Sequence, residues 1–186
     1  ELKPGRRQPA RVLADRLGFF ILIFIAPAII LVFACGQRPA TLMLSMGSPR
    51  SWLPVTALLT ALAAALGFFS TKSSLDLQIY PQYMPARWTA GSIVNEAGSW
   101  ALYLLAYEFA LRGYLLAALL PSGAPAAVAA TTAIYSIAHT PKSGKEAAGS
   151  LCFGVVLSAL TLHWHTLVPA FIIHLALALG NDVGAL

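Results

Sequence analysis

The run GFFILIFIAPAIILVFAC, from Gly18 to Cys35, contains no charged residue and is close to the roughly 20 apolar residues that a helix needs to cross a bilayer core. The composition of the whole chain agrees with this reading. Of its 186 residues, 58% are hydrophobic and only 10% are charged, whereas an ordinary soluble domain carries about 25% charged residues. So few charges cannot cover a soluble surface, and the sequence therefore predicts an all-α, polytopic transmembrane helical bundle embedded in a lipid bilayer.

Further apolar runs follow along the chain, each bounded by Gly, Pro, His or charged residues. We expect about six spans, at residues 18–35, 53–70, 98–120, 125–139, 147–162 and 167–180, of which the last three are short for a bilayer. The segment 71–97 carries Tyr80, Tyr83 and Trp88 among scattered polar residues, a composition typical of an interfacial stretch. Residues 1–186 are predicted to form a single transmembrane domain, with a basic cytoplasmic tail at 1–17.

The placement of lysine and arginine predicts the orientation. With the amino-terminal tail inside, nine basic residues fall on the inner side: Lys3, Arg6, Arg7, Arg11, Arg16, Lys72, Arg87, Lys142 and Lys145. Only Arg38 and Arg50 fall outside. This asymmetry satisfies the positive-inside rule and predicts a multi-pass protein of the cell membrane with both termini in the cytoplasm.

The net charge and the positions of the two cysteines argue against a nucleic-acid partner and against a disulfide framework. The net charge of +5 has no aromatic-interleaved basic face, so nucleic acid is not an expected partner, and anionic lipid headgroups account for the charge. Cys35 and Cys152 both fall in apolar runs, whereas a disulfide framework would place them in loops. We interpret both cysteines as apolar packing residues.

Glu108 and Arg112 interrupt the third apolar run, at the positions where a charge is most expensive. A charge at the bilayer centre costs at least about 2.5 to 3.5 kcal/mol on insertion scales, so each needs a partner. Four residues apart, the two share a helix face and are expected to pair, which by itself indicates either a structural ion pair or a functional site. His139 and His174 lie at the end of the fourth run and within the sixth, where they can converge with this pair on one cavity.

Three short motifs, taken together, resemble the CPBP family of intramembrane glutamic proteases, which includes the type II CAAX prenyl endopeptidases and bacteriocin-processing enzymes. The first motif of that family, Glu-Glu-x-x-x-Arg-Gly, is similar to residues 107–113, YEFALRG. The second, an aromatic residue followed after three spacers by His, matches Tyr135 to His139. The third, a His after a Leu-x-Pro-Ala segment, matches residues 167–170 leading to His174. The motif-bearing catalytic core implied by the resemblance is 98–181.

The chain departs from the family pattern at two positions. Tyr107 stands where the family has its leading, catalytic Glu, which leaves Glu108 as the carboxylate of the first motif. Ala178 stands where the family has an Asn, four residues after the third-motif His. Asn181 lies seven residues after His174, on the same helix face, and is a candidate substitute.

The resemblance implies a peptidase in which Glu108 activates a water, His139 shares that water and His174 donates to the oxyanion, with Arg112 orienting the carboxylate and Asn181 assisting. The expected partner is a protein or peptide substrate, without a cofactor. A His-His-carboxylate zinc site formed by Glu108, His139 and His174 is the competing chemistry. Two other functions stay open: a non-catalytic scaffold or immunity protein that keeps the fold, and a small-solute transporter. The sequence supports the transporter least, since it shows no inverted repeat.

Overall fold

The computed structural model describes residues 8–71, 80–140 and 144–186. Its helical elements, in which η marks a π-helical or 3-10 segment, are α1 (Pro9–Phe20), η1 (Ile21–Ile25), α2 (Ala26–Ile29), η2 (Ile30–Ala34), η3 (Pro39–Leu42), α3 (Pro49–Ser70), α5 (Ala90–Glu108), η4 (Phe109–Leu115), α6 (Leu116–Leu119), η5 (Leu120–Ser122), α7 (Ala124–Ile137), α8 (Gly144–Trp164) and α9 (Val168–Gly184). No strand occurs within these ranges, so the predicted all-α class is confirmed.

Four continuous helical segments are long and apolar enough to cross a membrane: Pro9–Ala34, Pro49–Ser70, Ala90–Ser122 and Gly144–Trp164. Two shorter apolar helices, α7 and α9, complete the bundle. Each of the six predicted apolar runs therefore lies largely within a helical segment, and the protein is a multi-pass helical membrane protein. Many large apolar side chains on η1, η2, α3 and α8 are exposed, as expected of helices whose outer faces contact lipid rather than water.

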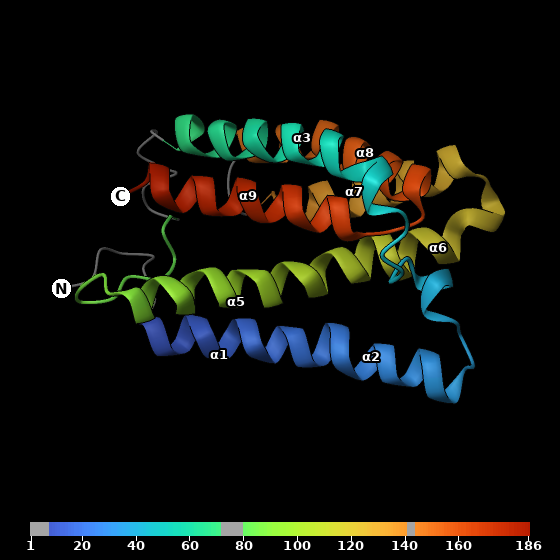
Figure 1. Ribbon diagram of the computed structural model, residues 1–186, viewed down its shortest axis with the longest axis horizontal. Coiled ribbons are helices and arrows are strands. Elements are labelled where there is room, and N and C mark those ends of the chain that lie inside the picture. Colours follow the sequence, from blue (N-terminus) through green and yellow to red (C-terminus); the bar gives the residue numbers. More distant parts are fainter. Residues whose placement is uncertain (1–7, 72–79, 141–143) are drawn as a thin grey trace.

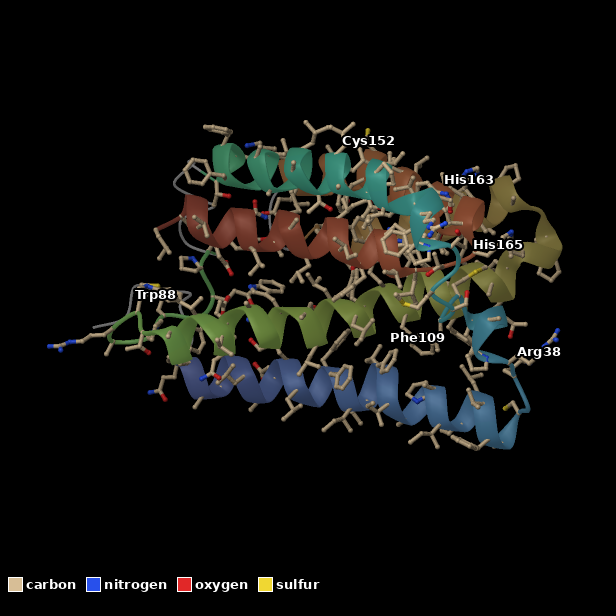
Figure 2. All side chains as sticks on the ribbon, in the orientation of Figure 1. Arg38, Trp88, Phe109, Cys152, His163 and His165 are labelled. Carbon is tan, nitrogen blue, oxygen red and sulfur yellow. The ribbon has the colours of Figure 1, made fainter. Side chains whose placement is uncertain are left out.

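The helices pack in a chain of neighbours, α1 on α5, α5 on α9 and α9 on α3, while α8 packs on both α7 and α9. Figure 1 shows that the start of α1, the start of α5 and the end of α9 lie at the same end of the bundle. In Figure 2, Trp88 marks this end, and Arg38, His163 and His165 mark the opposite one. The two ends of the bundle therefore carry different polar residues.

Two glycines allow α3 and α9 to approach backbone to backbone. A Cβ atom at Gly180 of α9 would collide with the carbonyl oxygen of Ala64, and one at Gly67 of α3 would lie 2.5 Å from the carbonyl oxygen of Leu177. Small residues at such contacts are how membrane helices gain packing where lipid provides no hydrophobic driving force. This contact fixes α9, and with it His174, against the rest of the bundle.

Several boundaries differ from the sequence-based predictions. The first helix begins at Pro9 rather than Gly18, so residues 9–17 of the predicted tail are helical, and Arg16 is buried rather than a free tail cation. Helix α5 begins at Ala90 rather than at 98, inside the predicted interfacial stretch. Thr89 and Ser92 form a reciprocal capping box there, with the Thr89 side chain accepting from the Ser92 amide and the Ser92 side chain from the Thr89 amide.

Three further sequence-based predictions, on the cysteines, on two tyrosines and on the basic residues, differ from the structure or concern residues that it does not describe. Cys35 and Cys152 are both exposed, so the interpretation of both as apolar packing residues was wrong. Tyr80 and Tyr83 are buried against the bundle rather than lying on its surface. Five basic residues of the orientation argument, Lys3, Arg6, Arg7, Lys72 and Lys142, lie outside the described residues.

Candidate active site

Glu108 is the last residue of α5, immediately before the π-helical segment η4, and its side chain is completely buried. The Arg112 Nη1 atom lies 3.0 Å from its Oε2 and donates to its Oε1 at 3.1 Å. The predicted pairing of these two residues is therefore confirmed. Arg112 also lies with its guanidinium carbon 4.7 Å from the centre of the Tyr135 ring, so a carboxylate and an aromatic face together stabilise this buried cation.

His174 of α9 reaches the same carboxylate from the opposite side. Its Nδ1 donates to Glu108 Oε1 at 2.5 Å. In the neutral ring this leaves Nε2 as the nitrogen without a proton, and Nε2 lies 3.5 Å from the Tyr135 hydroxyl. Glu108 therefore fixes both the tautomer and the orientation of His174, in the way that carboxylates orient catalytic histidines.

His139 follows the last turn of α7 and is held in a comparable manner. Because a carbonyl oxygen can only accept, the 2.8 Å contact between His139 Nδ1 and the Tyr135 carbonyl places the proton on Nδ1. The His139 ring packs on the Tyr135 ring with 4.5 Å between their centres. Each histidine thus has its Nδ1 bound to an acceptor and its Nε2 as the basic nitrogen.

Tyr107, which replaces the leading Glu of the family motif, lies between the two histidines. Its ring centre is 6.4 Å from that of His139 and 5.9 Å from that of His174, both in edge-to-face geometry. It also packs edge-to-face on Tyr135 at 5.8 Å. The site is therefore an aromatic frame around two imidazoles, with a carboxylate behind one of them.

These side chains line one part of a cavity of about 1040 Å³. Its lining includes Tyr107, Tyr135, Phe153, His139 and His174, and continues to residues near the start of α1 and the end of α9, among them Asp15, Arg16 and Asn181. Glu108 and Arg112 do not line it. Both histidines thus face a space large enough for a peptide segment, while the carboxylate lies behind His174.

The structure brings together four of the five predicted site residues. Glu108, Arg112 and His174 contact one another directly, and His139 joins them through Tyr135. Asn181 does not join them, because seven residues place it about 10 Å along the helix from His174. Its side chain instead accepts a hydrogen bond from Thr71 at 3.0 Å. Asn181 lines the cavity near its far end and is not placed to assist at His174.

Sequence reasoning missed two features. The first is the role of Tyr135, which the sequence analysis considered only as the aromatic residue of the second motif. In the structure Tyr135 contacts Arg112 and both histidines. Its spacing of four residues from His139 could have indicated the contact with that histidine. A second buried polar cluster, formed by Arg16, Glu96, Ser99, Trp100 and Asp182, was not predicted. Its members are up to 166 positions apart between Arg16 and Asp182, and no local pattern connects them.

The arrangement of the side chains that could bind a metal ion argues against the zinc site considered from the sequence. Within residues 8–71, 80–140 and 144–186, no group of three or more His, Cys, Asp or Glu side chains is arranged to hold a metal ion. His139 and His174 each offer one Nε2, but the carboxylate that would be the third ligand binds Nδ1 of His174 instead. The arrangement fits two histidines acting on a water more simply than it fits a three-ligand site.

The residues that form this site fall within a match to a known protein family. Residues 89–179 match the family model described as type II CAAX prenyl endopeptidase Rce1-like. The matched segment contains α5, both histidines and all three motifs. No curated protein and no solved structure gives a significant match to the chain.

Proposed function

Because residues 89–179 belong to the Rce1-like group of the CPBP family, a family of CAAX-type intramembrane proteases, we propose that this protein is an endopeptidase in which His139 and His174 activate a water inside the membrane. The observation that carries the proposal is the hydrogen bond from His174 Nδ1 to the buried Glu108 carboxylate. It leaves Nε2 as the basic nitrogen of His174, which lines the cavity, as does His139 with its own basic Nε2.

The division of roles follows from the tautomers. A water held between two Nε2 acceptors directs a lone pair away from both histidines, toward a peptide carbonyl in the cavity. His174 takes a proton from this water as the C–O bond forms, and the Glu108 carboxylate stabilises the resulting imidazolium without taking the proton. The same proton then passes to the leaving amine as the C–N bond breaks. The products are two peptides, one with a new carboxylate and one with a new amine.

This assignment changes the role predicted for Glu108. The sequence-based hypothesis made Glu108 the base, but its burial behind His174 and its contact with Arg112 favour an orienting role. The Tyr135 hydroxyl, 3.5 Å from His174 Nε2, supplies a donor in the same part of the cavity for the developing oxyanion. Arg112 binds the Glu108 carboxylate and holds it in place.

The test uses purified protein in lipid vesicles with a prenylated CAAX peptide, the substrate type named in the family description, and mass spectrometry to detect cleavage. We expect His139→Gln and His174→Gln to lose turnover by about 10²-fold or more, because Gln keeps a donor but offers no basic nitrogen. His163→Gln, an exposed histidine at the opposite end of the bundle, is the matched control and should cleave normally. Wild-type rates in His174→Gln would overturn the proposal.

A second candidate function rests on Tyr107 and Ala178. These stand where the family pattern has its leading Glu and its Asn, and a chain that lost both can bind a peptide without cleaving it. The same experiment separates the two functions. Peptide binding by wild-type protein with no cleavage under any condition would favour the non-catalytic scaffold or immunity role over the endopeptidase.

We further propose that the protein lies in the cell membrane with the start of α1 and the end of α9 in the cytoplasm. Arg11 lies near the start of α1, Arg87 shortly before α5, and Lys145 at the start of α8, where it donates to the Ser70 carbonyl at the end of α3. Arg38 lies at the opposite end of the bundle (Figure 2), which is the asymmetry that the positive-inside rule describes. The far end of the cavity, lined by Asp15, Arg16 and Lys145, then faces the cytoplasm and is the expected entrance for a cytoplasmic peptide.

A further inference from the structure

The segment that connects η2 to α3, residues 36–48, buries part of its length inside the bundle. Leu42 and Met43 are only 4% and 5% exposed, and they form one apolar cluster with Phe109 of η4 and with Leu167, the residue that precedes α9. Figure 2 labels Phe109 on the side of the bundle nearer to Arg38. The segment is therefore part of the packed core and not only a connection between two helices.

Backbone groups of this segment contact both η4 and the start of α9. The amide of Leu167 donates to the Met43 carbonyl at 2.9 Å. A Cβ atom at Gly113 of η4 would lie 2.9 Å from the Leu42 carbonyl oxygen, so these two backbones approach as closely as a glycine permits. Met43 has a φ of 55°, a left-handed conformation that few residues other than glycine adopt. This conformation sets the angle between the two successive carbonyls, each of which contacts a different element.

The two elements that the segment joins carry the two partners of the buried hydrogen bond at the site. Glu108 immediately precedes Phe109 and η4, and His174 lies in α9, seven residues after Leu167. Glu108 and His174 meet through a single hydrogen bond between Oε1 and Nδ1. A hydrogen bond weakens steeply as its distance and angle depart from the optimum. A small shift of the start of α9 relative to η4 would therefore weaken this bond.

Helices α5 and α9 are fastened to each other on the other side of this bond as well. The start of α5 and the end of α9 lie at the same end of the bundle, so the two helices run in opposite directions (Figure 1). Trp100, eight residues before Glu108, donates its indole N–H to Asp182, eight residues after His174. The bond between Glu108 and His174 thus lies between two fixed points, the Trp100–Asp182 bond on one side and the 36–48 segment on the other.

We propose that Leu42 and Met43 are positioning residues, which hold Glu108 against His174 from the end of the bundle opposite the cavity entrance. Residues 36–48, all of which the structure describes, do not line the cavity, so they act through the Glu108–His174 pair and not on the peptide. Their effect on catalysis rests on the proposed endopeptidase function, whereas their effect on the pair does not. In the proposed orientation, a change at the outer face of the membrane reaches a site whose entrance is cytoplasmic.

The imidazole Nδ1 proton of His174 reports on the pair without any turnover. We would label the histidines with ¹⁵N, assign this proton resonance in detergent micelles by its loss in His174→Gln, and compare it between two methionine variants. In Met43→Ala we expect the resonance to shift or broaden, and kcat to fall roughly 10-fold to 100-fold with little change in KM. Met46→Ala is the matched control, since Met46 belongs to the same segment but is 59% exposed; both readouts should stay at wild-type values.

Three checks separate positioning from loss of the fold. The Trp100 indole resonance, at the other fixed point, should keep its native position in Met43→Ala. Met43→Leu, which nearly conserves the buried volume, should restore both the His174 resonance and kcat. If Met43→Ala does not fold, the milder Leu42→Val should shift the His174 resonance in the same direction by a smaller amount.

Two results bear on the inference and on the proposed function separately. A folded Met43→Ala protein with an unchanged His174 resonance would overturn the positioning role, and so would an unchanged resonance in folded Leu42→Val where Met43→Ala does not fold. Absence of cleavage by the wild-type protein would count against the endopeptidase, but the resonance would still decide whether the 36–48 segment holds Glu108 against His174.

Discussion

Glu108 and His174 lie 66 residues apart in the sequence, and a 2.5 Å hydrogen bond joins the carboxylate Oε1 of one to the imidazole Nδ1 of the other. Both side chains are buried, and they come from helices α5 and α9. The bond fixes which nitrogen of His174 faces the cavity, so the chemistry available to His174 depends on the residue at position 108. Replacing that residue tests the relationship directly.

We expect Glu108→Gln to reduce turnover by roughly 10²-fold to 10⁴-fold, with a smaller change in KM. Gln retains an acceptor for Nδ1, but it cannot compensate the positive charge that forms on His174 when the water loses its proton. Steady-state cleavage of the prenylated CAAX peptide measures both parameters. Glu146→Gln, a carboxylate near the cavity entrance, should remain close to wild type. A Glu108→Gln enzyme with normal kcat would show that this carboxylate has no role in the reaction.

Arg112→Ala should damage stability more than it damages binding of the peptide. Removing one partner of a buried ion pair leaves the other charge stranded, which typically costs about 3 to 5 kcal/mol. Here the stranded group is Glu108, and the stacking of Arg112 on Tyr135 is lost as well. Denaturant unfolding in micelles measures the difference, with the exposed Arg50→Ala as control.

The double variant Glu108→Gln with Arg112→Ala checks the cause of this loss. If stranding of the carboxylate is responsible, the double variant should be more stable than Arg112→Ala alone, because no buried charge remains unpaired. An Arg112→Ala protein as stable as wild type would contradict the interpretation of the pair as a structural necessity.

The presence of the helices was largely predictable from the sequence, because each membrane span is a long apolar run. What the runs did not reveal was where the helices begin. Pro9 and Ala90 start helices within polar sequence, and their signals are a proline in the first turn and the Thr89 capping box rather than hydrophobicity. A window that scores apolar residues alone starts both helices eight or nine positions late.

The site was predictable where its residues are neighbours in sequence. A spacing of four placed Glu108 and Arg112 on one face, and the structure pairs them. The direct contact of Glu108 with His174 depends on how α5 and α9 pack, and nothing in either helix alone specifies it. The same holds for Asp182 and Trp100, which lie 82 residues apart. Asn181 shows that residues on the same helix face need not belong to the same site. It shares a face with His174, but the two residues are about 10 Å apart along the helix axis.

Gly180→Ala should separate α3 from α9, because the added Cβ meets the backbone of Ala64, which cannot rotate away. Overpacking of this kind costs typically about 1 to 3 kcal/mol, and α9 carries His174, so activity should fall with stability. The matched control is Gly98→Ala on α5, where nothing lies within 4 Å of the new Cβ. That variant should be neutral or slightly stabilised, since Ala is the better helix former. Equal unfolding midpoints for the two variants would contradict the close packing.

The orientation predicts a different reactivity for the two exposed cysteines. Cys35 lies directly after η2, near Arg38 at the end of the bundle that we place outside, whereas Cys152 is in the apolar helix α8. A membrane-impermeant maleimide added to intact cells should therefore label Cys35, and Cys35→Ser should abolish the labelling. Cys152→Ser serves as the control and should label normally. Labelling of Cys35 only after the cells are opened would reverse the proposed orientation.

The last prediction concerns metal dependence, where the two readings of the histidines differ most. Both histidines hold Nδ1 against an acceptor and offer Nε2, which is also how zinc ligands are held by their outer-shell partners. A catalytic zinc site needs a third protein ligand, however, and the carboxylate that would supply it binds the wrong nitrogen of His174 for that purpose. To ligate zinc, Glu108 would have to leave both His174 and Arg112. We therefore expect a membrane-permeant zinc chelator to leave peptide cleavage unchanged. Stoichiometric zinc in active protein, with chelator inhibition that added zinc reverses, would instead make both histidines ligands and the bound water the nucleophile.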